Sequence, residues 1–138
     1  MPENDFRLAP IGVVRSTLKR REDAPRQARA GAPDAWIDLD PAVADGLQGI
    51  AVGDDLYVIT WLHLAARDTL QVHPRGDQSA PLAGVFTTRS PDRPNPLGLH
   101  RVTVRSIEGT RLMVGPLEAI DGTPVVDLKP PLTNCADA

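Results

Sequence analysis

Cysteine is nearly missing from the sequence: the only one among 138 residues is Cys135, three positions before the C-terminus. One cysteine cannot form a disulfide within the chain or build a cysteine-based metal site, and its isolation fits a reducing compartment. The three histidines, His63, His73 and His100, show none of the spacings typical of zinc ligands. We therefore expect no metal site.

Long apolar runs and phosphate-binding loops are also missing. No run approaches the about 18 consecutive apolar residues of a membrane span, and the N-terminal residues lack the apolar centre of a signal peptide. We expect a cytoplasmic protein that does not bind membranes. The motifs GxGxxG, GxxxxGKS/T and GxSxG do not occur, which excludes a Rossmann cofactor domain, a P-loop nucleotide hydrolase and a nucleophile elbow.

The sequence also lacks the periodicity of long helices. The 14 prolines and 11 glycines interrupt the chain too often for long helices. The apolar runs are short and rich in Val, Ile and Leu, which favours strands. The expected strands are Pro10–Val14, Trp36–Leu39, Asp55–His63, Thr69–Val72, Ala83–Thr87, Leu97–Ile107, Arg111–Val114 and Val125–Leu128. One short helix is expected after Asp40, which can cap it, with Pro41 in its first turn.

This pattern predicts an all-β protein. The 138 residues fit one domain, with a core at about residues 8–130 and a tail at 131–138. The strand spacing suits a barrel or a sandwich, and we favour a small β-barrel with long loops because closure removes the exposed edges of a small sheet. Residues 15–35 are expected to form a long mobile loop.

Charge is spread unevenly along the chain. Fifteen basic and 18 acidic residues give a formal net charge of −3, which argues against indiscriminate binding of nucleic acid. Residues 15–29 nevertheless hold six basic and two acidic side chains, and residues 89–105 hold four arginines and one aspartate. Such patches suit an anionic partner bound at a defined place, although a solvated loop gives the same pattern.

The most unusual segment is residues 84–99, GVFTTRSPDRPNPLGL, with three prolines within six residues. Proline restricts its own φ and the residue before it, so this loop is stiff and holds Arg89, Arg93 and Asn95 in place. Two guanidinium groups and an amide can recognise a carboxylate, a phosphate or a base edge. A rigid structural turn with solvated arginines fits the composition equally well.

A second segment, residues 117–130, places Asp121 and Gly122 in a tight turn before an apolar strand. Glu118 and Asp121 bring negative charge to this turn. They can serve a cationic ligand or pair with nearby arginines. His63, at the end of a strand, is either a hydrogen-bonded structural group or a catalyst.

Several motifs occur in the order of a known family: IGVVRS at residues 11–16, Pro25-Arg26-Gln27, the strand ending at His63, residues 84–99, and IDGTPVVDLKP at residues 120–130. By these motifs the chain resembles the TsaA-like (TrmO, YaeB-like) family of tRNA N6-threonylcarbamoyladenosine methyltransferases. The resemblance implies a single-sheeted β-barrel, a homodimer, and S-adenosylmethionine bound outside the Rossmann class. Two positions depart from the family pattern: Glu118 replaces a common aspartate, and Pro131 replaces a tyrosine.

The resemblance also implies which residues contact the cofactor. They are Pro25, Arg26, Gln27, His63, Leu64, Arg89, Leu99, Glu118, Ala119, Ile120 and Asp121. Arg26 or Arg89 suits the carboxylate of S-adenosylmethionine, and Leu64 and Leu99 suit its adenine. Carboxylates or backbone carbonyls suit its sulfonium and amino groups.

The implied reaction transfers the sulfonium methyl group, by in-line displacement, to the modified adenosine beside the tRNA anticodon. No catalytic residue is identified, and Glu118, Asp127 and His63 are candidates for the base that takes the acceptor's proton. Arg93, Asn95 and the basic residues 19–21 are expected to contact tRNA. A methyltransferase for a small-molecule acceptor and a non-catalytic S-adenosylmethionine-binding module are the alternatives.

Overall fold

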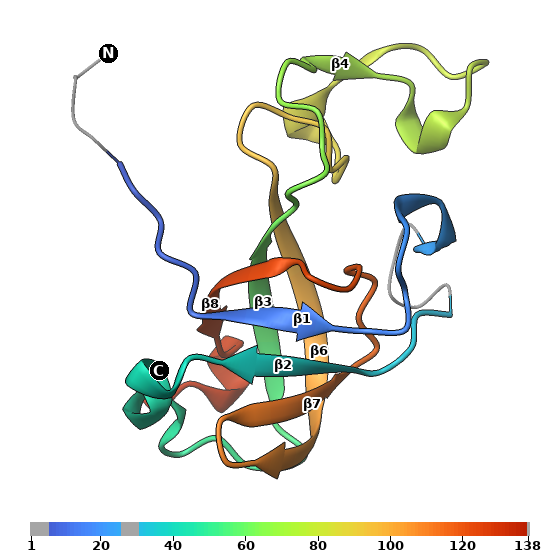
Figure 1. The fold of residues 1–138 in the computed structure, drawn as a ribbon. Helices are drawn as coiled ribbons and strands as arrows, with labels where there is room; N and C mark the ends of the chain where they lie inside the picture. Colours follow the sequence, from blue (N-terminus) through green and yellow to red (C-terminus); the bar gives the residue numbers. More distant parts are fainter. Residues whose placement is uncertain (1–5, 26–30, 138) are drawn as a thin grey trace.

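The computed structural model describes residues 6–25 and 31–137, and these form a closed antiparallel barrel with a lobe at one end (Figure 1). The barrel strands are β1 (Gly12–Arg15), β2 (Ala35–Leu39), β3 (Asp55–Trp61), β6 (Leu97–Glu108), β7 (Arg111–Gly115) and β8 (Pro124–Lys129). Their order is β1-β2-β7-β6-β3-β8, and β8 pairs with β1 to close the barrel. The predicted all-β, single-sheeted barrel is confirmed.

The interior of the barrel follows from alternation along each strand. Successive side chains of a strand point to opposite faces, so every second residue enters the interior. On β3 the buried residues are Leu56, Val58 and Thr60, and on β6 Val102 and Val104 lie in the same interior. The other side chains that are fully shielded from solvent include Val14, Ile37, Leu112, Val114, Leu117 and Val125.

A tight turn sets the register where β6 runs into β7. Gly109 joins β6 to β7 with a φ of 60°, in the left-handed region that glycine adopts without steric cost. The turn leaves Glu108 opposite Arg111. A β-bulge between Val104 and Ser106 then shifts the register, so that Val104 lies opposite Val114 and both side chains enter the barrel interior.

Residues 62–96 leave the barrel between β3 and β6 and form the lobe. It contains a small two-stranded sheet, β4 (Gln71–Val72) with β5 (Ala83–Gly84), and the 3-10 turns η4 (Pro74–Gly76) and η5 (Val85–Thr87). Figure 1 shows the lobe beyond the end of the barrel at which β3 stops and β6 starts. The 3-10 helix η3 (Pro41–Leu47) lies at the opposite end.

Most predicted strands appear at their expected positions, but the strand over Ala83–Thr87 is wrong beyond Gly84. The guanidinium of Arg93 donates hydrogen bonds to the carbonyls of Val85 and Thr88, at 2.8 and 3.1 Å, and residues 85–87 curl around it as η5. The short helix after Asp40 is confirmed as η3, because the Asp40 carboxylate accepts from the backbone N–H of Ala42 at 2.9 Å. In the segment predicted as a tail, Pro131 is buried and η6 (Leu132–Asn134) forms one turn.

The barrel core predicts a large stability difference between two leucines. Leu112→Ala should lower the free energy of unfolding by about 2–5 kcal/mol, because Leu112 is fully shielded from solvent and its truncation leaves a cavity. Leu132→Ala, at a side chain that is 79% exposed, should change it by less than about 0.5 kcal/mol. Urea denaturation of both variants measures the difference, and equal effects would contradict this description of the core.

Candidate functional site

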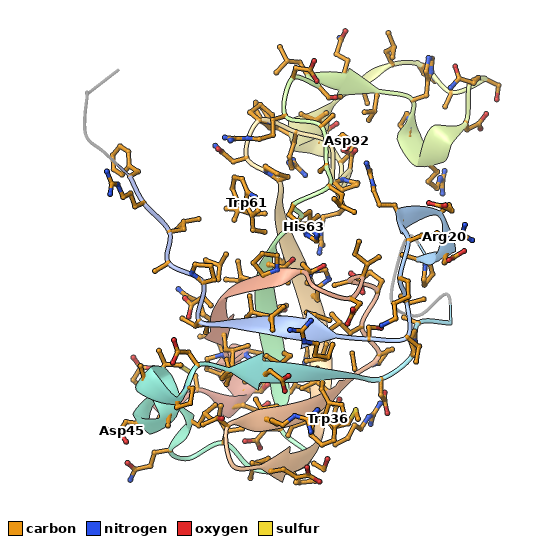
Figure 2. The ribbon with its side chains drawn as sticks, in the orientation of Figure 1. Arg20, Trp36, Asp45, Trp61, His63 and Asp92 are labelled. Atoms are coloured by element: carbon orange, nitrogen blue, oxygen red, sulfur yellow. The ribbon has the colours of Figure 1, made fainter. Side chains whose placement is uncertain are left out.

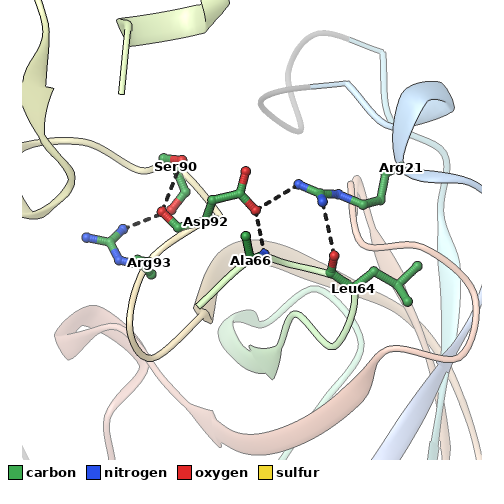
Figure 3. Close-up of polar contacts among 6 residues, drawn as sticks. All are labelled: Arg21, Leu64, Ala66, Ser90, Asp92 and Arg93. Atoms are coloured by element: carbon green, nitrogen blue, oxygen red, sulfur yellow. Dashed lines mark hydrogen bonds and ion pairs between the residues drawn. The ribbon is translucent and has the colours of Figure 1, made fainter. Parts of the chain in front are cut away.

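The proline-rich loop is organised around an internal arginine. Arg93 donates to the Ser90 carbonyl at 3.1 Å (Figure 3), in addition to the carbonyls of Val85 and Thr88. The amide oxygen of Asn95 accepts from Arg67 at 3.3 Å. The hypothesis that Arg93 is held out for a ligand is therefore wrong, since its N–H groups bind the loop's own carbonyls.

Arg89 connects the same loop to the barrel. Its guanidinium donates to the backbone carbonyl of Leu99 on β6, with an N···O distance of 2.8 Å. The Arg89 side chain is exposed, and the Leu99 side chain is 44% exposed. This pair presents a cation and an apolar side chain on one surface at the lobe end of the barrel.

Arg21, in the 3-10 turn η1 (Arg21–Asp23), ties the segment after β1 to the lobe. Its guanidinium donates to the Leu64 carbonyl at 3.0 Å and to the Asp92 carboxylate at 3.1 Å (Figure 3). The same Asp92 oxygen accepts from the backbone N–H of Ala66 at 2.9 Å. One carboxylate thus connects three segments: η1, the turn after β3, and the proline-rich loop.

Asp121 ties the segment after β1 to the loop between β7 and β8. Its carboxylate accepts from the backbone N–H of Ser16 at 3.0 Å and pairs with Lys19 at 3.2 Å, while its own N–H donates to the Leu18 carbonyl at 2.7 Å. The Ser16 hydrogen bond is the main cause that lowers the pKa of Asp121, and Lys19 adds to it. A surface hollow of about 500 Å³ lies here, bordered by Arg15, Ser16, Lys19, Trp36 and Asp121, among others.

A buried polar chain lies at the same end of the barrel interior. His100, on β6, pairs through Nδ1 with Oε1 of Glu118 and through Nε2 with the hydroxyl of Thr60, the latter at 2.7 Å. His100 and Thr60 are 5% and 0% exposed. Gly98 makes room for this chain, because a Cβ there would come within 2.3 Å of the Thr60 hydroxyl oxygen. Oε2 of Glu118 is buried and has no hydrogen-bond partner among the described residues.

Comparison with known proteins identifies the family of this chain. The sequence model of the family described as the tRNA-methyltransferase O N-terminal domain matches residues 13–137. The chain belongs to this family. A probable S-adenosyl-L-methionine-binding protein of Methanothermobacter thermautotrophicus is 43% identical over 130 residues, which cover 94% of this chain and 93% of that protein. An S-adenosyl-L-methionine-binding protein of Archaeoglobus fulgidus is 46% identical over 122 residues, covering 88% and 86%.

The fold of this TrmO-family chain also matches solved structures. The crystal structure of TrmO from Pseudomonas aeruginosa superimposes with a TM-score of 0.74 at 28% identity, covering 98% of this chain. The chain spans 61% of the length of that TrmO chain.

The residues that the resemblance implied as cofactor contacts come from separate segments that meet at the lobe end of the barrel. His63 lies between barrel and lobe (Figure 2), and Leu64, whose carbonyl accepts from Arg21 of η1, follows it. Pro25 follows η1, whereas Arg26 and Gln27 lie outside the described residues. Ala119 and Ile120 are buried as whole residues, at only 3% and 8% exposure.

One of the candidate bases, Asp127, lies away from the lobe end of the barrel. A buried polar residue, His100, was not predicted from the sequence. Asp127 borders a separate hollow of about 420 Å³ next to Leu47 of η3, near the opposite end of the barrel. His100 was not singled out from the sequence, although the alternation of Val102 and Val104, extended by one step, places it in the interior.

Two kinds of feature, a membrane-spanning helix and a metal-binding group, are not found in the described part of the chain. Within residues 6–25 and 31–137, no helix is long and apolar enough to cross a membrane. Over the same described part of the chain, no group of three His, Cys, Asp or Glu side chains is arranged to hold a metal ion.

The Asp121 contacts predict a pH-dependent contribution to stability. Asp121→Ala should lower the free energy of unfolding at pH 7 by about 1–3 kcal/mol, because the buried Ser16 N–H loses its acceptor. Folding lowers the pKa of Asp121, so the unfolded state binds more protons in acid. The stabilisation that the Asp121 carboxylate gives the folded state is therefore lost as the pH falls below about 4.

Urea denaturation of wild type and variant between pH 7 and pH 3 measures this effect. The difference between them should shrink at the acidic end. Asp121→Asn, which keeps an acceptor but removes the charge, should be less destabilising at pH 7. A difference that stays constant over the whole range would contradict the assigned role of the carboxylate.

Proposed function

We propose that this chain binds S-adenosylmethionine at the lobe end of the barrel and transfers its methyl group to N6-threonylcarbamoyladenosine beside the tRNA anticodon. The observation that carries the proposal is the convergence of separate segments at one end of the barrel. Arg21, Arg89 and Asp121 tie these segments together. Membership of the TrmO family supports the reaction, and the names of the two archaeal relatives support the cofactor.

The residues present at this end fit the parts of the cofactor. The exposed guanidinium of Arg89 suits a carboxylate, and the exposed side chains of Leu64 and Leu99, at 53% and 44%, offer apolar surface to a purine ring. The carboxylates of Glu118 and Asp121 supply negative charge for a sulfonium and an ammonium group. Oε2 of Glu118 has no hydrogen-bond partner among the described residues.

The chain's contribution to the reaction is alignment and proton uptake. S-adenosylmethionine, when bound, supplies an electrophilic methyl group whose transfer leaves a neutral thioether. The site must hold the acceptor nitrogen in line with the methyl–sulfur bond and accept the proton that this nitrogen releases. His63 suits proton uptake best, because it is exposed between barrel and lobe, whereas Asp127 lies by another hollow and Oε2 of Glu118 is buried.

The tRNA and the assembly are part of the same proposal. The side chains of Lys19 and Arg20 are 65% and 68% exposed beside the site, which suits phosphate contacts even though both also pair with acids.

A homodimer in the cytoplasm is proposed from the family resemblance. Phe86, Leu70 and Leu82 of the lobe, at 79%, 63% and 55% exposure, offer apolar surface for the second subunit.

Non-catalytic S-adenosylmethionine binding is the second candidate function. It is favoured by the fact that the two archaeal relatives are named only as binding proteins and that the chain spans 61% of the solved TrmO chain. A small-molecule acceptor is the third possibility, and the acceptor assay separates it from tRNA.

Calorimetric titration with S-adenosylmethionine, with ATP as control, followed by a methyl-transfer assay, tests the proposal. Methyl transfer to tRNA that carries the threonylcarbamoyl group, but not to the same tRNA without it, is expected. The tRNA affinity should fall steeply with salt. Binding of S-adenosylmethionine without transfer to any tRNA would favour the binding module, and selective binding of ATP would overturn the assigned cofactor.

A single arginine variant tests the position of the site. Arg89→Ala should weaken S-adenosylmethionine binding at least tenfold, which is about 1.4 kcal/mol, through loss of the cation beside Leu99. Arg101→Ala is the matched control, because Arg101 is also exposed on β6 but pairs with Asp55 at 3.1 Å. Unchanged affinity in a folded Arg89→Ala variant would remove Arg89 from the site.

A further inference from the structure

The outer face of β3 carries aromatic side chains that the barrel interior leaves uncovered. The outward residues of this strand include Tyr57, Ile59 and Trp61, which are all partly exposed. Leu97 of the neighbouring β6 lies opposite Trp61 and is 44% exposed. At about 3.3 Å per residue, Tyr57 and Trp61 stand about 13 Å apart on the same face. An aromatic and apolar strip thus runs along the outside of the barrel.

Each end of this strip has an exposed basic side chain that no acid neutralises. The guanidinium of Arg67 lies over the Trp61 ring, 5.0 Å from its centroid, and donates to two neutral oxygens of the proline-rich loop. Lys129, on β8, lies opposite Tyr57. Within residues 6–25 and 31–137, neither Arg67 nor Lys129 forms an ion pair. Both therefore keep a full positive charge on the surface.

A second tryptophan–arginine pair of the barrel differs in charge. The guanidinium of Arg111 lies over the Trp36 ring, 4.2 Å from its centroid, but it also pairs with the Asp38 carboxylate at 2.6 Å. Figure 2 shows Trp61 toward the lobe and Trp36 on a different part of the barrel. Only the Trp61 pair combines an aromatic ring with a cation that is free to bind an anion. A molecule with planar rings and negative charge can use both.

The acids next to the strip do not cancel its positive charge. The outward acids of β3 and β8 are Asp55 and Asp127. Asp55 already pairs with Arg101 at 3.1 Å, so Asp127 is left against two cations, Arg67 and Lys129. A second copy that met this face with the same face would bring an excess of like charge together. A polyanion with unpaired bases complements both the charge and the rings of the strip.

We propose that the outer face of β3, from Trp61 to Tyr57, is a stacking platform for the unpaired bases of single-stranded RNA, whose phosphates Arg67 and Lys129 contact. The inference rests on the proposed function and deepens it, because it assigns a surface to the nucleotides that flank the methyl acceptor. Trp61 lies two residues before His63, so RNA on this face leads to the lobe end of the barrel. Stacking on aromatic rings tolerates any base, so the platform orients the RNA without reading its sequence.

The test is the affinity of the full chain for a fluorescently labelled single-stranded RNA of about eight nucleotides, measured by fluorescence anisotropy without S-adenosylmethionine. Trp61→Leu should weaken binding at least about fivefold, through the loss of one stacked base. Trp36→Leu is the matched control and should leave the dissociation constant within about twofold, since Arg111 is neutralised. Lys129→Gln should reduce the slope of log affinity against log salt concentration by about 0.7, the contribution of one phosphate contact.

The outcomes also separate the platform from other uses of this face. Equal weakening in Trp61→Leu and Trp36→Leu, or no binding of single-stranded RNA by the wild type, would overturn the inference. Dissociation of a dimer by Trp61→Leu in sedimentation velocity, with unchanged RNA affinity, would assign the face to a second copy and overturn it as well. If Trp61→Leu does not fold, the salt slope of Lys129→Gln decides, and an unchanged slope would contradict the platform.

The inference and the proposed function fail in different ways. Methyl transfer to tRNA with an unchanged KM in a folded Trp61→Leu variant would overturn the platform and leave the proposed function standing. Binding of single-stranded RNA that depends on Trp61, in a protein that transfers no methyl group to tRNA, would support the platform and overturn the proposed function.

Discussion

The pairing of β1 with β8 brings the first strand of the chain beside its last loop. Gly12 lies opposite Val125 and Val13 opposite Pro124, and the Val14 N–H continues the contact to the Thr123 carbonyl at 2.9 Å. Closure places the residues after β1 against the β7–β8 loop, where Asp121 binds Ser16 over a separation of 105 residues. The segment that follows β1 then contacts the lobe through Arg21.

The interior of the barrel is apolar along most of its length and polar at the lobe end. Strand alternation fills the core with valine, leucine and isoleucine, and the same alternation brings Thr60 and His100 inside near the lobe. Glu118 enters from the β7–β8 loop to meet them. The outer surface at this end carries Arg89, Leu64 and Leu99. Cationic, anionic and apolar side chains thus lie together at the lobe end of one barrel.

The strands and the barrel were predictable from sequence because their signals are local: short β-branched runs, alternation, and turns such as the one at Gly109. The roles of the arginines were not. Arg93 lies in a segment whose composition suits ligand binding. Its hydrogen-bond partners, however, are carbonyls that come close only after the loop folds. Arg21 and Asp92 are 71 residues apart, and no local pattern pairs them. The segments proposed for the site come from the family resemblance, whereas the buried His100–Glu118 pair needed the strand register.

The most direct test of the central claim, that the lobe end of the barrel is the cofactor site, is a map of amide shifts. The ¹⁵N-labelled protein is titrated with S-adenosylmethionine and followed by heteronuclear NMR. The largest changes are expected at Leu64, Arg89, Leu99 and residues 118–121. Changes confined to the hollow beside η3, at Val43, Leu47 and Leu128, would contradict it.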